Sequence, residues 1–271
     1  MWGNDVTGRP DAKGIAVVTG GAGAGIGHGI SVAMAANGWY VVIADRDVAA
    51  AEELTAKLLE TGASAQSLQL EVSQEAAVDA AMDDIAARLG SIDVLVNSAG
   101  VGLISALGDV SSADWDRLFA VDLRGAWLTS RACLRHMVPR RKGVLIHLGS
   151  VQALGAAAGY GAYAAAKTGL VGMSRGLAAD YGPVGIRSVV VHPGMVDSPQ
   201  NREIFSNFGD PDSFISEYLN SRQMLPQLIQ PIDIGNVVAF LASPSAAAVT
   251  GTEFVVDGGS SAMAFDRRGG V

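Results

Sequence analysis

Tyr163 and Lys167 lie four residues apart in the segment "YAAAK". The surrounding sequence predicts a helix from about Tyr160 to Tyr181, and residues four apart project from the same face of a helix. Free tyrosine has a pKa of roughly 10 and is therefore a weak base near neutral pH. A neighbouring ammonium group favours the phenolate form. The pair is thus suited to moving a proton to or from a hydroxyl group, and Ser150, after the predicted strand 143–149, can hydrogen-bond the oxygen.

A glycine-rich stretch, "TGGAGAGIGHG" (19–29), lies between a predicted strand at Ile15–Val18 and a predicted helix at Ile26–Asn37. A glycine loop in this position binds the pyrophosphate of a dinucleotide through backbone amides and the helix N-terminus. Asp45 ends the next predicted strand, twenty residues after Gly25, where a carboxylate accepts hydrogen bonds from ribose hydroxyls. Together with the tyrosine–lysine pair, these features point to hydride transfer between an alcohol or ketone and a nicotinamide.

Apolar strands alternate with helical segments along the chain. Strands are predicted at Ile15–Val18, Tyr40–Ala44, Ser67–Val72, Ile92–Val96, 143–149, 186–192 and 252–259, and helices at Ile26–Asn37, Asp47–Thr61, Gln74–Leu89, Asp114–Met137, Tyr160–Tyr181 and Ile232–Ala242. This alternation predicts an α/β fold, a Rossmann-like doubly wound parallel sheet of about seven strands with helices on both faces. We expect a single domain over residues 1–271, with an irregular insertion near 199–226 that forms a lid over the substrate.

The composition limits the partners. The 271 residues carry a net charge of −8, which argues against nucleic acid or an anionic membrane surface as a partner. Eight glycines interrupt the uncharged run from Gly14 to Ala44, so we expect no membrane span there. Cys133 is the single cysteine, which excludes an internal disulfide and is typical of a cytoplasmic protein.

The motifs, in their order over residues 13–260, resemble the short-chain dehydrogenase/reductase family. Gly21-x-x-x-Gly25-x-Gly27 is similar to its glycine loop, although Thr19-Gly20 stands one residue earlier than usual. Ser150, Tyr163 and Lys167 match its catalytic serine and its Tyr-x-x-x-Lys pair, and Ser150 precedes Tyr163 by the usual thirteen residues. Other matches are "NSAG" (97–100), "PGMVDS" (193–198) for the nicotinamide carboxamide, and "DGG" (257–259) after the last strand.

The resemblance implies the site residues. The expected catalytic residues are Asp122, Ser150, Tyr163 and Lys167. The expected cofactor contacts are Gly21, Ala24, Gly25, Ile26, Gly27, Asp45, Arg46, Glu71, Val72, Asn97, Ala99, Gly100, Tyr163, Lys167, Pro193, Gly194, Val196 and Ser198. The expected substrate contacts are Ser150, Gln152, Tyr160, Tyr163 and Met195. Tyr163 is the expected acid and base, and the family's lysine also bonds the nicotinamide ribose.

Three residues depart from the family pattern. Asp122, in "VDLRG", stands where the family usually has the Asn of its Asn-Ser-Tyr-Lys tetrad, whose backbone carbonyl holds a water at a helix distortion. Glu71 stands where an Asp commonly contacts adenine, and Val189 replaces an Asn that often precedes the Pro-Gly turn. The Tyr–Lys core is kept, whereas the proton relay through position 122 is an open question.

The cofactor and the assembly can also be predicted. We expect NAD(H) rather than NADP(H), because Asp45 would repel a 2′-phosphate and Ala24 supplies no positive charge; Arg46 is the opposing feature, since it could bind that phosphate. The resemblance implies a homotetramer, or a homodimer. Helices 114–137 and 160–181 are expected at one interface and Ala262–Val271 at another.

Several other patterns suggest competing chemistry. Tyr160 lies seven residues before Lys167, a spacing similar to that of enoyl reductases in the same superfamily, but we assign it to the substrate pocket wall. Gly172-Met173-Ser174-Arg175-Gly176 spells the nucleophile elbow of α/β hydrolases, yet it lies inside a predicted helix rather than directly after a strand. The histidines have no ligand spacing, and we expect no metal site; they are His28, His136, His147 and His192.

The sequence thus predicts an NAD(H)-dependent alcohol dehydrogenase or ketone reductase. Two alternatives stay open, a reductase of enone double bonds and an NAD(H)-binding regulator without catalysis. The substrate itself is not readable. Apolar residues near the expected lid indicate either an apolar body on the alcohol or simple packing of the lid; they are Met195, Phe205, Phe208, Phe214 and Tyr218.

Overall fold

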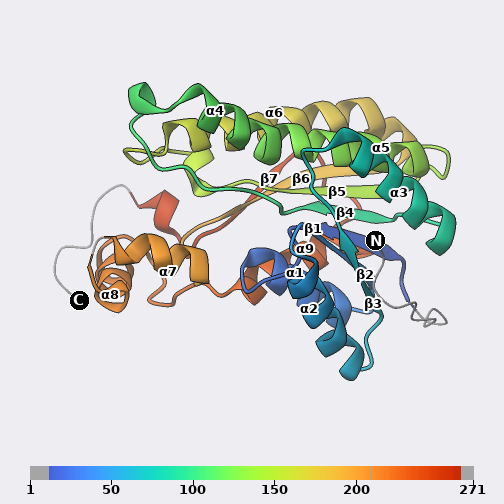
Figure 1. Cartoon of the computed structure of the whole chain (residues 1–271), viewed down its shortest axis with the longest axis horizontal. Coiled ribbons are helices and arrows are strands. Elements are labelled where there is room, and N and C mark those ends of the chain that lie inside the picture. The colour runs from blue at the N-terminus through green and yellow to red at the C-terminus, as the bar shows by residue number, and fades with distance from the viewer. Residues whose placement is uncertain (1–11, 208, 264–271) are drawn as a thin grey trace.

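A parallel sheet runs through the centre of the protein (Figure 1). The computed structural model describes residues 12–207 and 209–263, so Phe208 and most of the expected interface tail lie outside it. Within these residues seven strands form one sheet in the order β3-β2-β1-β4-β5-β6-β7. They are β1 (Ile15–Thr19), β2 (Tyr40–Asp45), β3 (Ala65–Gln69), β4 (Val94–Asn97), β5 (Gly143–Leu148), β6 (Ile186–Pro193) and β7 (Glu253–Val256). All neighbouring pairs are parallel.

Helices cover both faces of this sheet (Figure 1). They are α1 (Ile26–Ala36), α2 (Val48–Glu60), α3 (Glu75–Leu89), α4 (Ser112–Phe119), α5 (Ala126–Met137), α6 (Gly161–Tyr181), α7 (Pro199–Ser206), α8 (Pro211–Ser221) and α9 (Pro231–Ala242). The apolar core under α1, α2 and α9 is separate from the core under α3 and α5. The predicted doubly wound α/β sheet is therefore confirmed. No helix in the described part of the chain is long and apolar enough to cross a membrane.

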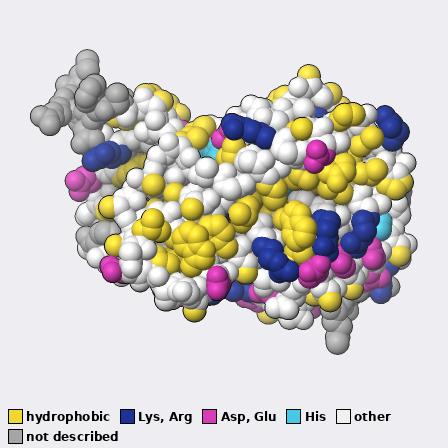
Figure 2. All heavy atoms as spheres, turned by 90° about the horizontal axis from the view of Figure 1, so that it is seen from above, with side chains coloured by type: hydrophobic (Ala, Val, Ile, Leu, Met, Phe, Trp, Pro, Cys, Tyr) yellow, Lys and Arg dark blue, Asp and Glu magenta, His cyan; other side chains and the backbone are white. Residues whose placement is uncertain are grey.

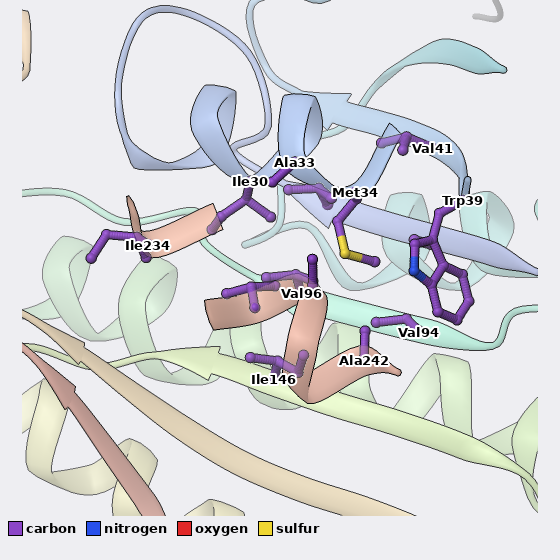
Figure 3. Packing of buried hydrophobic residues seen from close by; sticks show 14 of the residues in the cluster. Ile30, Ala33, Met34, Trp39, Val41, Val94, Val96, Ile146, Ile234 and Ala242 are labelled. Atoms are coloured by element: carbon purple, nitrogen blue, oxygen red, sulfur yellow. The ribbon is translucent and has the colours of Figure 1, made fainter. Parts of the chain in front are cut away.

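The alternation of side chains along each strand builds these two cores. Val17 faces α3 and α5, whereas Val18 faces α1 and α9, and both are fully buried. Figure 3 shows the core under α1, α2 and α9, which includes Met34 of α1, Val96 of β4 and Ile234 of α9. Because the strand order reverses between β1 and β4, the loops after these strands diverge and leave a crevice at their carboxyl ends, where ligands bind in such sheets.

The long helix and the third strand are among the predicted elements that differ from the structure. The long helix expected at Asp114–Met137 is interrupted, because the chain is π-helical over Ala120–Gly125 between α4 and α5. The third strand starts at Ala65 rather than Ser67 and ends at Gln69 rather than Val72. Its start is polar but buried, since Tyr40 Oη donates to Gln66 Oε1 at 3.0 Å, and this hid the strand from a search for apolar runs.

The insertion near 199–226, predicted to be irregular, contains α7 and α8. Each helix begins with a proline directly after a capping residue. Ser198 Oγ accepts from Asn201 N at 3.2 Å, and Asp210 Oδ2 accepts from Ser213 N at 2.9 Å. A capping side chain followed by proline is a helix start signal, so the Ser-Pro and Asp-Pro pairs would have predicted both helices.

Candidate active site

A cavity of about 1010 Å³ opens at the carboxyl ends of the strands. The loops after the first six strands, β1 to β6, line it, and α7 and α8 close one end. The glycine loop and Asp45 line the same cavity as Ser150, Tyr163 and Lys167. Among the predicted site residues, three do not line it: Gly21, Asn97 and Val196.

The glycine loop packs tightly against the start of α1 at one glycine and has free space beside two others that line the cavity. A Cβ on Gly27 would overlap the carbonyl oxygen of Gly20, so the turn and α1 meet too closely for a side chain. A Cβ on Gly23 or Gly25 would meet nothing within 4 Å. This open cradle, next to the N-terminus of α1, fits a pyrophosphate group bound through backbone amides.

Gly21 faces the sheet instead of the cavity. Its amide donates to Ala44 O at 3.4 Å, and its carbonyl accepts from Ser31 Oγ at 2.9 Å. The part of the loop that lines the cavity is Gly20 and Ala22–Gly27, and sequence matching missed the contributions of Gly20, Ala22 and Gly23. Thr19 Oγ1 accepts from Ser98 N and Ala99 N at 3.2 and 3.3 Å, which ties β1 to the loop after β4.

The acidic residues at the adenosine end are held by the backbone. Asp45 Oδ2 accepts from Ala22 N at 3.1 Å, and Oδ1 accepts from Asp47 N at 3.0 Å. Glu71 Oε1 accepts from Ser73 N and Oγ at 3.2 and 3.0 Å. A carboxylate offers about four acceptor positions, so both side chains keep capacity for a ligand. Arg46 and Val72 also line this end.

Asn97, the last residue of β4, points toward α5 and does not line the cavity. Its Nδ2 donates to Ala126 O at 3.2 Å and Ser130 Oγ at 3.1 Å, and its Oδ1 accepts from Thr129 Oγ1 at 2.6 Å. These bonds fix β4 to α5. Val196 is also fully buried, where a β-bridge joins it to Ile229. Neither residue is among those that line the cavity.

Lys167 is buried behind Tyr163 on α6. Its Nζ donates to Leu148 O at 3.0 Å and lies 5.4 Å from the centroid of the Tyr163 ring. Asp122, from the π-helical segment, completes the contacts, with Oδ2 3.1 Å from Lys167 Nζ and Oδ1 accepting from Val101 N at 2.8 Å. The two side chains are 5% and 0% exposed. A Cβ on Gly100 would lie 3.0 Å from Asp122 Oδ2, so a larger residue there would crowd the ion pair.

The charges around Lys167 decide its protonation. Burial by itself lowers the pKa of Lys167, but the negative charges of the Tyr163 phenolate and of Asp122 outweigh burial and raise it. The lysine is therefore held as a cation, and Asp122 acts on it directly through its side chain. In the family pattern the backbone carbonyl at this position holds a water, whereas here the side chain of Asp122 also pairs with the lysine.

Ser150 stands at the end of β5, facing the cavity. Its Oγ accepts from Gln152 N at 3.2 Å, which leaves the hydroxyl proton free to donate to a ligand. Gln152 is itself oriented, because its Oε1 accepts from Ala157 N at 2.8 Å. Tyr160 caps the start of α6, and its ring centroid lies 6.3 Å from that of Tyr163. Burial, with a smaller contribution from Tyr163, raises the pKa of Tyr160.

The remaining predicted residues that line the cavity are Ala24, Ile26, Ala99, Gly100, Pro193, Gly194, Met195 and Ser198. Ser174, in the elbow-like sequence, is 1% exposed inside α6 and bonds Ser188 Oγ at 2.8 Å, so it is no nucleophile. Within residues 12–207 and 209–263, no group of three or more His, Cys, Asp or Glu side chains could hold a metal ion.

Comparisons with known proteins agree with this geometry. A family profile described as enoyl-(acyl carrier protein) reductase matches residues 21–261. The chain is 36% identical to 2-(S)-hydroxypropyl-CoM dehydrogenase 3 of Xanthobacter autotrophicus, over 92% of this chain and 97% of that protein. It is 33% identical to cyclopentanol dehydrogenase of a Comamonas species, over 94% and 99%. A short-chain dehydrogenase/reductase structure from Burkholderia xenovorans superposes with a TM-score of 0.88 at 31% identity, over 93% and 98%. The chain belongs to the short-chain dehydrogenase/reductase family.

Proposed function

We propose that this protein is an NAD(H)-dependent oxidoreductase that interconverts an uncharged secondary alcohol and its ketone. The observation that carries the proposal is the meeting of Ser150, Tyr163 and Lys167 in one cavity with the open glycine loop and Asp45. The two relatives described above are named as dehydrogenases of a cyclic alcohol and of a hydroxypropyl compound, which supports this reaction class.

Tyr163 is the proposed acid and base. When an alcohol is oxidised, its hydroxyl proton passes to Tyr163 Oη, and when a ketone is reduced the proton returns from the phenol. Lys167, 5.4 Å from the ring centroid, favours the phenolate form. Ser150 donates its free hydroxyl proton to the substrate oxygen. A bound nicotinamide supplies or accepts the hydride.

NAD(H) is the proposed cofactor because of the charge at Asp45. This carboxylate is fixed by two backbone amides at the end of β2, where the ribose hydroxyls of an adenosine would lie. A 2′-phosphate there would face a like charge, which can cost several kcal/mol. Arg46 is exposed, and its guanidinium group could bind a 2′-phosphate. A comparison of kcat/KM with NAD(H) and NADP(H) therefore tests the proposed preference.

An uncharged substrate is proposed because the end of the cavity near α7 and α8 combines apolar side chains with the neutral amides of Gln200 and Asn201. Its lining includes Ile104, Met195, Ile204, Phe205, Phe214 and Tyr218. The rings of Phe205 and Phe214 stack, with centroids 4.9 Å apart. Glu203 is the single charged side chain among the described residues that line this end. An anionic substrate would meet a like charge and no cation there, and it is therefore disfavoured.

A second candidate is reduction of a carbon–carbon double bond, which the description of the matching family profile favours. Tyr160 would then be the proton donor. Its pKa is raised, chiefly by burial, and a neutral phenol is a suitable donor. Tyr163, however, is the tyrosine whose ring lies beside Lys167, and this favours reversible proton transfer at an alcohol.

One experiment separates these functions and a third, a regulator that binds NAD(H) without catalysis. The protein is mixed with NADH and a panel of cyclic and linear ketones and enones, and with NAD⁺ and the matching alcohols, while nicotinamide absorbance is followed. Turnover of ketones and alcohols supports the proposal. Turnover of enones alone would assign double-bond reduction, and NADH binding without any turnover would assign the regulator.

We further propose that the protein forms a homotetramer, or a homodimer. Figure 2 shows apolar side chains gathered on the face formed by α4, α5 and α6, with charged side chains beside them. Trp115 and Trp127 are 37% and 43% exposed, although they are large and apolar. Apolar patches of this kind mark interfaces. Light scattering that showed a stable monomer at micromolar concentration would contradict the proposal.

A further inference from the structure

A buried histidine lies directly behind Ser150. His192, at the end of β6, is fully buried, and its Nδ1 lies 3.0 Å from Ser150 N and 2.8 Å from Ser150 O. A Cβ on Gly149 would lie 2.5 Å from the same nitrogen, so the Gly149–Ser150 turn wraps closely around the ring. The imidazole does not line the cavity described above. It therefore contacts the site through the main chain of Ser150.

The far side of the ring is held by a carboxylate. His192 Nε2 lies 2.9 Å from Glu253 Oε2, and the other oxygen of Glu253 accepts from Arg175 Nη2 at 2.6 Å. Because an ionised carboxylate can only accept, Nε2 must carry a proton. The chain of contacts thus runs from α6 through β7 and β6 to the end of β5.

The proton on Nε2 determines what Nδ1 can do. In the neutral ring Nδ1 has a lone pair and accepts from Ser150 N–H, whereas in the imidazolium it carries a proton and donates to the Ser150 carbonyl. Both partners are within hydrogen-bond distance, so the main chain of Ser150 is bonded to the ring in either state. The charged groups that face the ring are Glu253 directly and Arg175 through Glu253.

We propose that His192, oriented by Glu253, is a positioning residue for Ser150 in the oxidoreductase reaction, and this rests on the function proposed above. Ser150 Oγ projects from an extended residue, with φ −166° and ψ 155°, so a change in its main chain displaces the hydroxyl. A displacement of about 1 Å at a group that positions substrate can reduce the rate by about 100-fold. His192 is expected to affect turnover through this displacement and to leave cofactor binding unchanged.

The test is a double-mutant cycle on kcat/KM. His192→Leu removes both bonds to the main chain and is expected to lower kcat/KM by about 100-fold in the wild-type background. In the Ser150→Ala background, where no hydroxyl remains to be placed, the further loss is expected to be less than about 3-fold. The affinity for NADH is expected to be unchanged in both backgrounds. Equal losses in the two backgrounds would overturn the proposal.

Two further variants separate positioning from folding. His192→Asn keeps a polar group near Nδ1 and is expected to recover most of the loss. His147, a second fully buried histidine, bonds Asn97 and Ser188 but not Ser150, so His147→Leu is the matched control. Whatever it costs, the factor should be the same in both Ser150 backgrounds.

Amide hydrogen exchange gives a readout that does not depend on turnover. The Ser150 amide is expected to exchange faster in His192→Leu, with the amides of β5 unchanged. If the wild type turned over no substrate, the proposed function would fail while this exchange would still decide the role of His192. An unchanged Ser150 amide would refute that role even in an active enzyme.

Discussion

Replacing Asp122 by asparagine removes a charge without changing the shape of the side chain. Asp122 Oδ1 accepts from Val101 N at 2.8 Å, and Oδ2 lies 3.1 Å from Lys167 Nζ. An amide has one oxygen that accepts and one nitrogen that donates. Asp122→Asn can therefore accept from Val101 or from Lys167, but not from both, and its nitrogen then faces a donor.

Two opposing contributions set the size of the effect. At 3.1 Å, two unit charges attract by about 5 kcal/mol at an effective dielectric constant of about 20. Desolvation of the two buried ions costs several kcal/mol and offsets most of this. The main net cost of Asp122→Asn is then the buried N–H donor that no longer has an acceptor, which is worth about 1–3 kcal/mol. We expect Asp122→Asn to lower the free energy of unfolding by about this amount.

The pH profile should move as well. The charge of Asp122 is one of the contributions that raise the pKa of Lys167 against burial, so its removal lowers that pKa. The negative charge of Asp122 repels the Tyr163 phenolate, so removing it stabilises the phenolate directly. Removing it also makes Lys167 less cationic, which weakens the attraction between the lysine and the phenolate. Because these contributions oppose each other, the pH profile of alcohol oxidation is expected to move by no more than about one unit, equivalent to about 1.4 kcal/mol.

The assay is a series of kcat/KM values for alcohol oxidation against pH, together with chemical unfolding. Asp122→Asn is expected to keep activity within about 10-fold of the wild type. Asp122→Leu leaves the buried ammonium group unpaired and is expected to lose about 3–5 kcal/mol of stability and most activity. If Asp122→Asn lost as much activity as Tyr163→Phe, the carboxylate itself would transfer protons and the reasoning here would be wrong. Unchanged stability would contradict the count of acceptors.

Three other outcomes are expected. Tyr163→Phe should abolish turnover and leave NADH affinity nearly intact, whereas Lys167→Ala should damage both; more than about a tenth of the activity in Tyr163→Phe would require another base. The ratio of kcat/KM for NAD⁺ to that for NADP⁺ should exceed one and fall in Asp45→Ala, and equal values in the wild type would refute the preference. Burial lowers the pKa of His147 from 6.5 to about 4. Between pH 4 and pH 6.5 the unfolded chain therefore binds more protons than the folded protein. Stability should then fall by about 3 kcal/mol between pH 6.5 and 4, measured by urea unfolding, and His147→Gln should remove this dependence.

The parts of the fold predicted correctly from sequence are those in which one short segment decides its own conformation. The strands around the site are apolar runs buried on both sides, and the Tyr163–Lys167 spacing lies within one helix. Asn97 could also have been placed from sequence. Leu95 packs in the core under α5, and a strand alternates every second residue, so Asn97 must face α5 as well. Its predicted role as a cofactor contact rests on the family motif, and in the structure it does not line the cavity.

The rest depends on segments far apart in the chain. The bond between Asp122 and Lys167 forms because a π-helical segment and α6 meet across the end of β5, and nothing local to either residue indicates it. His192 is equally uninformative in sequence, since a single histidine in an apolar strand has no predicted partner. Its role follows only from the turn at Gly149 and the carboxylate on β7.

Three consecutive residues at the end of β5 connect the Asp122–Lys167 ion pair with the hydrogen bond between Glu253 and His192. Leu148 accepts from Lys167 through its carbonyl, and Ser150 is bonded to His192 through its main chain. The proposed proton-transfer pair and the proposed oxygen-binding hydroxyl are thus fixed to one short piece of backbone, two residues apart. A movement of this strand end would carry both together and would keep their spacing. Their relative geometry therefore depends less on the side chains that face the cavity than on Asp122 and Glu253, which hold Lys167 and His192 from behind.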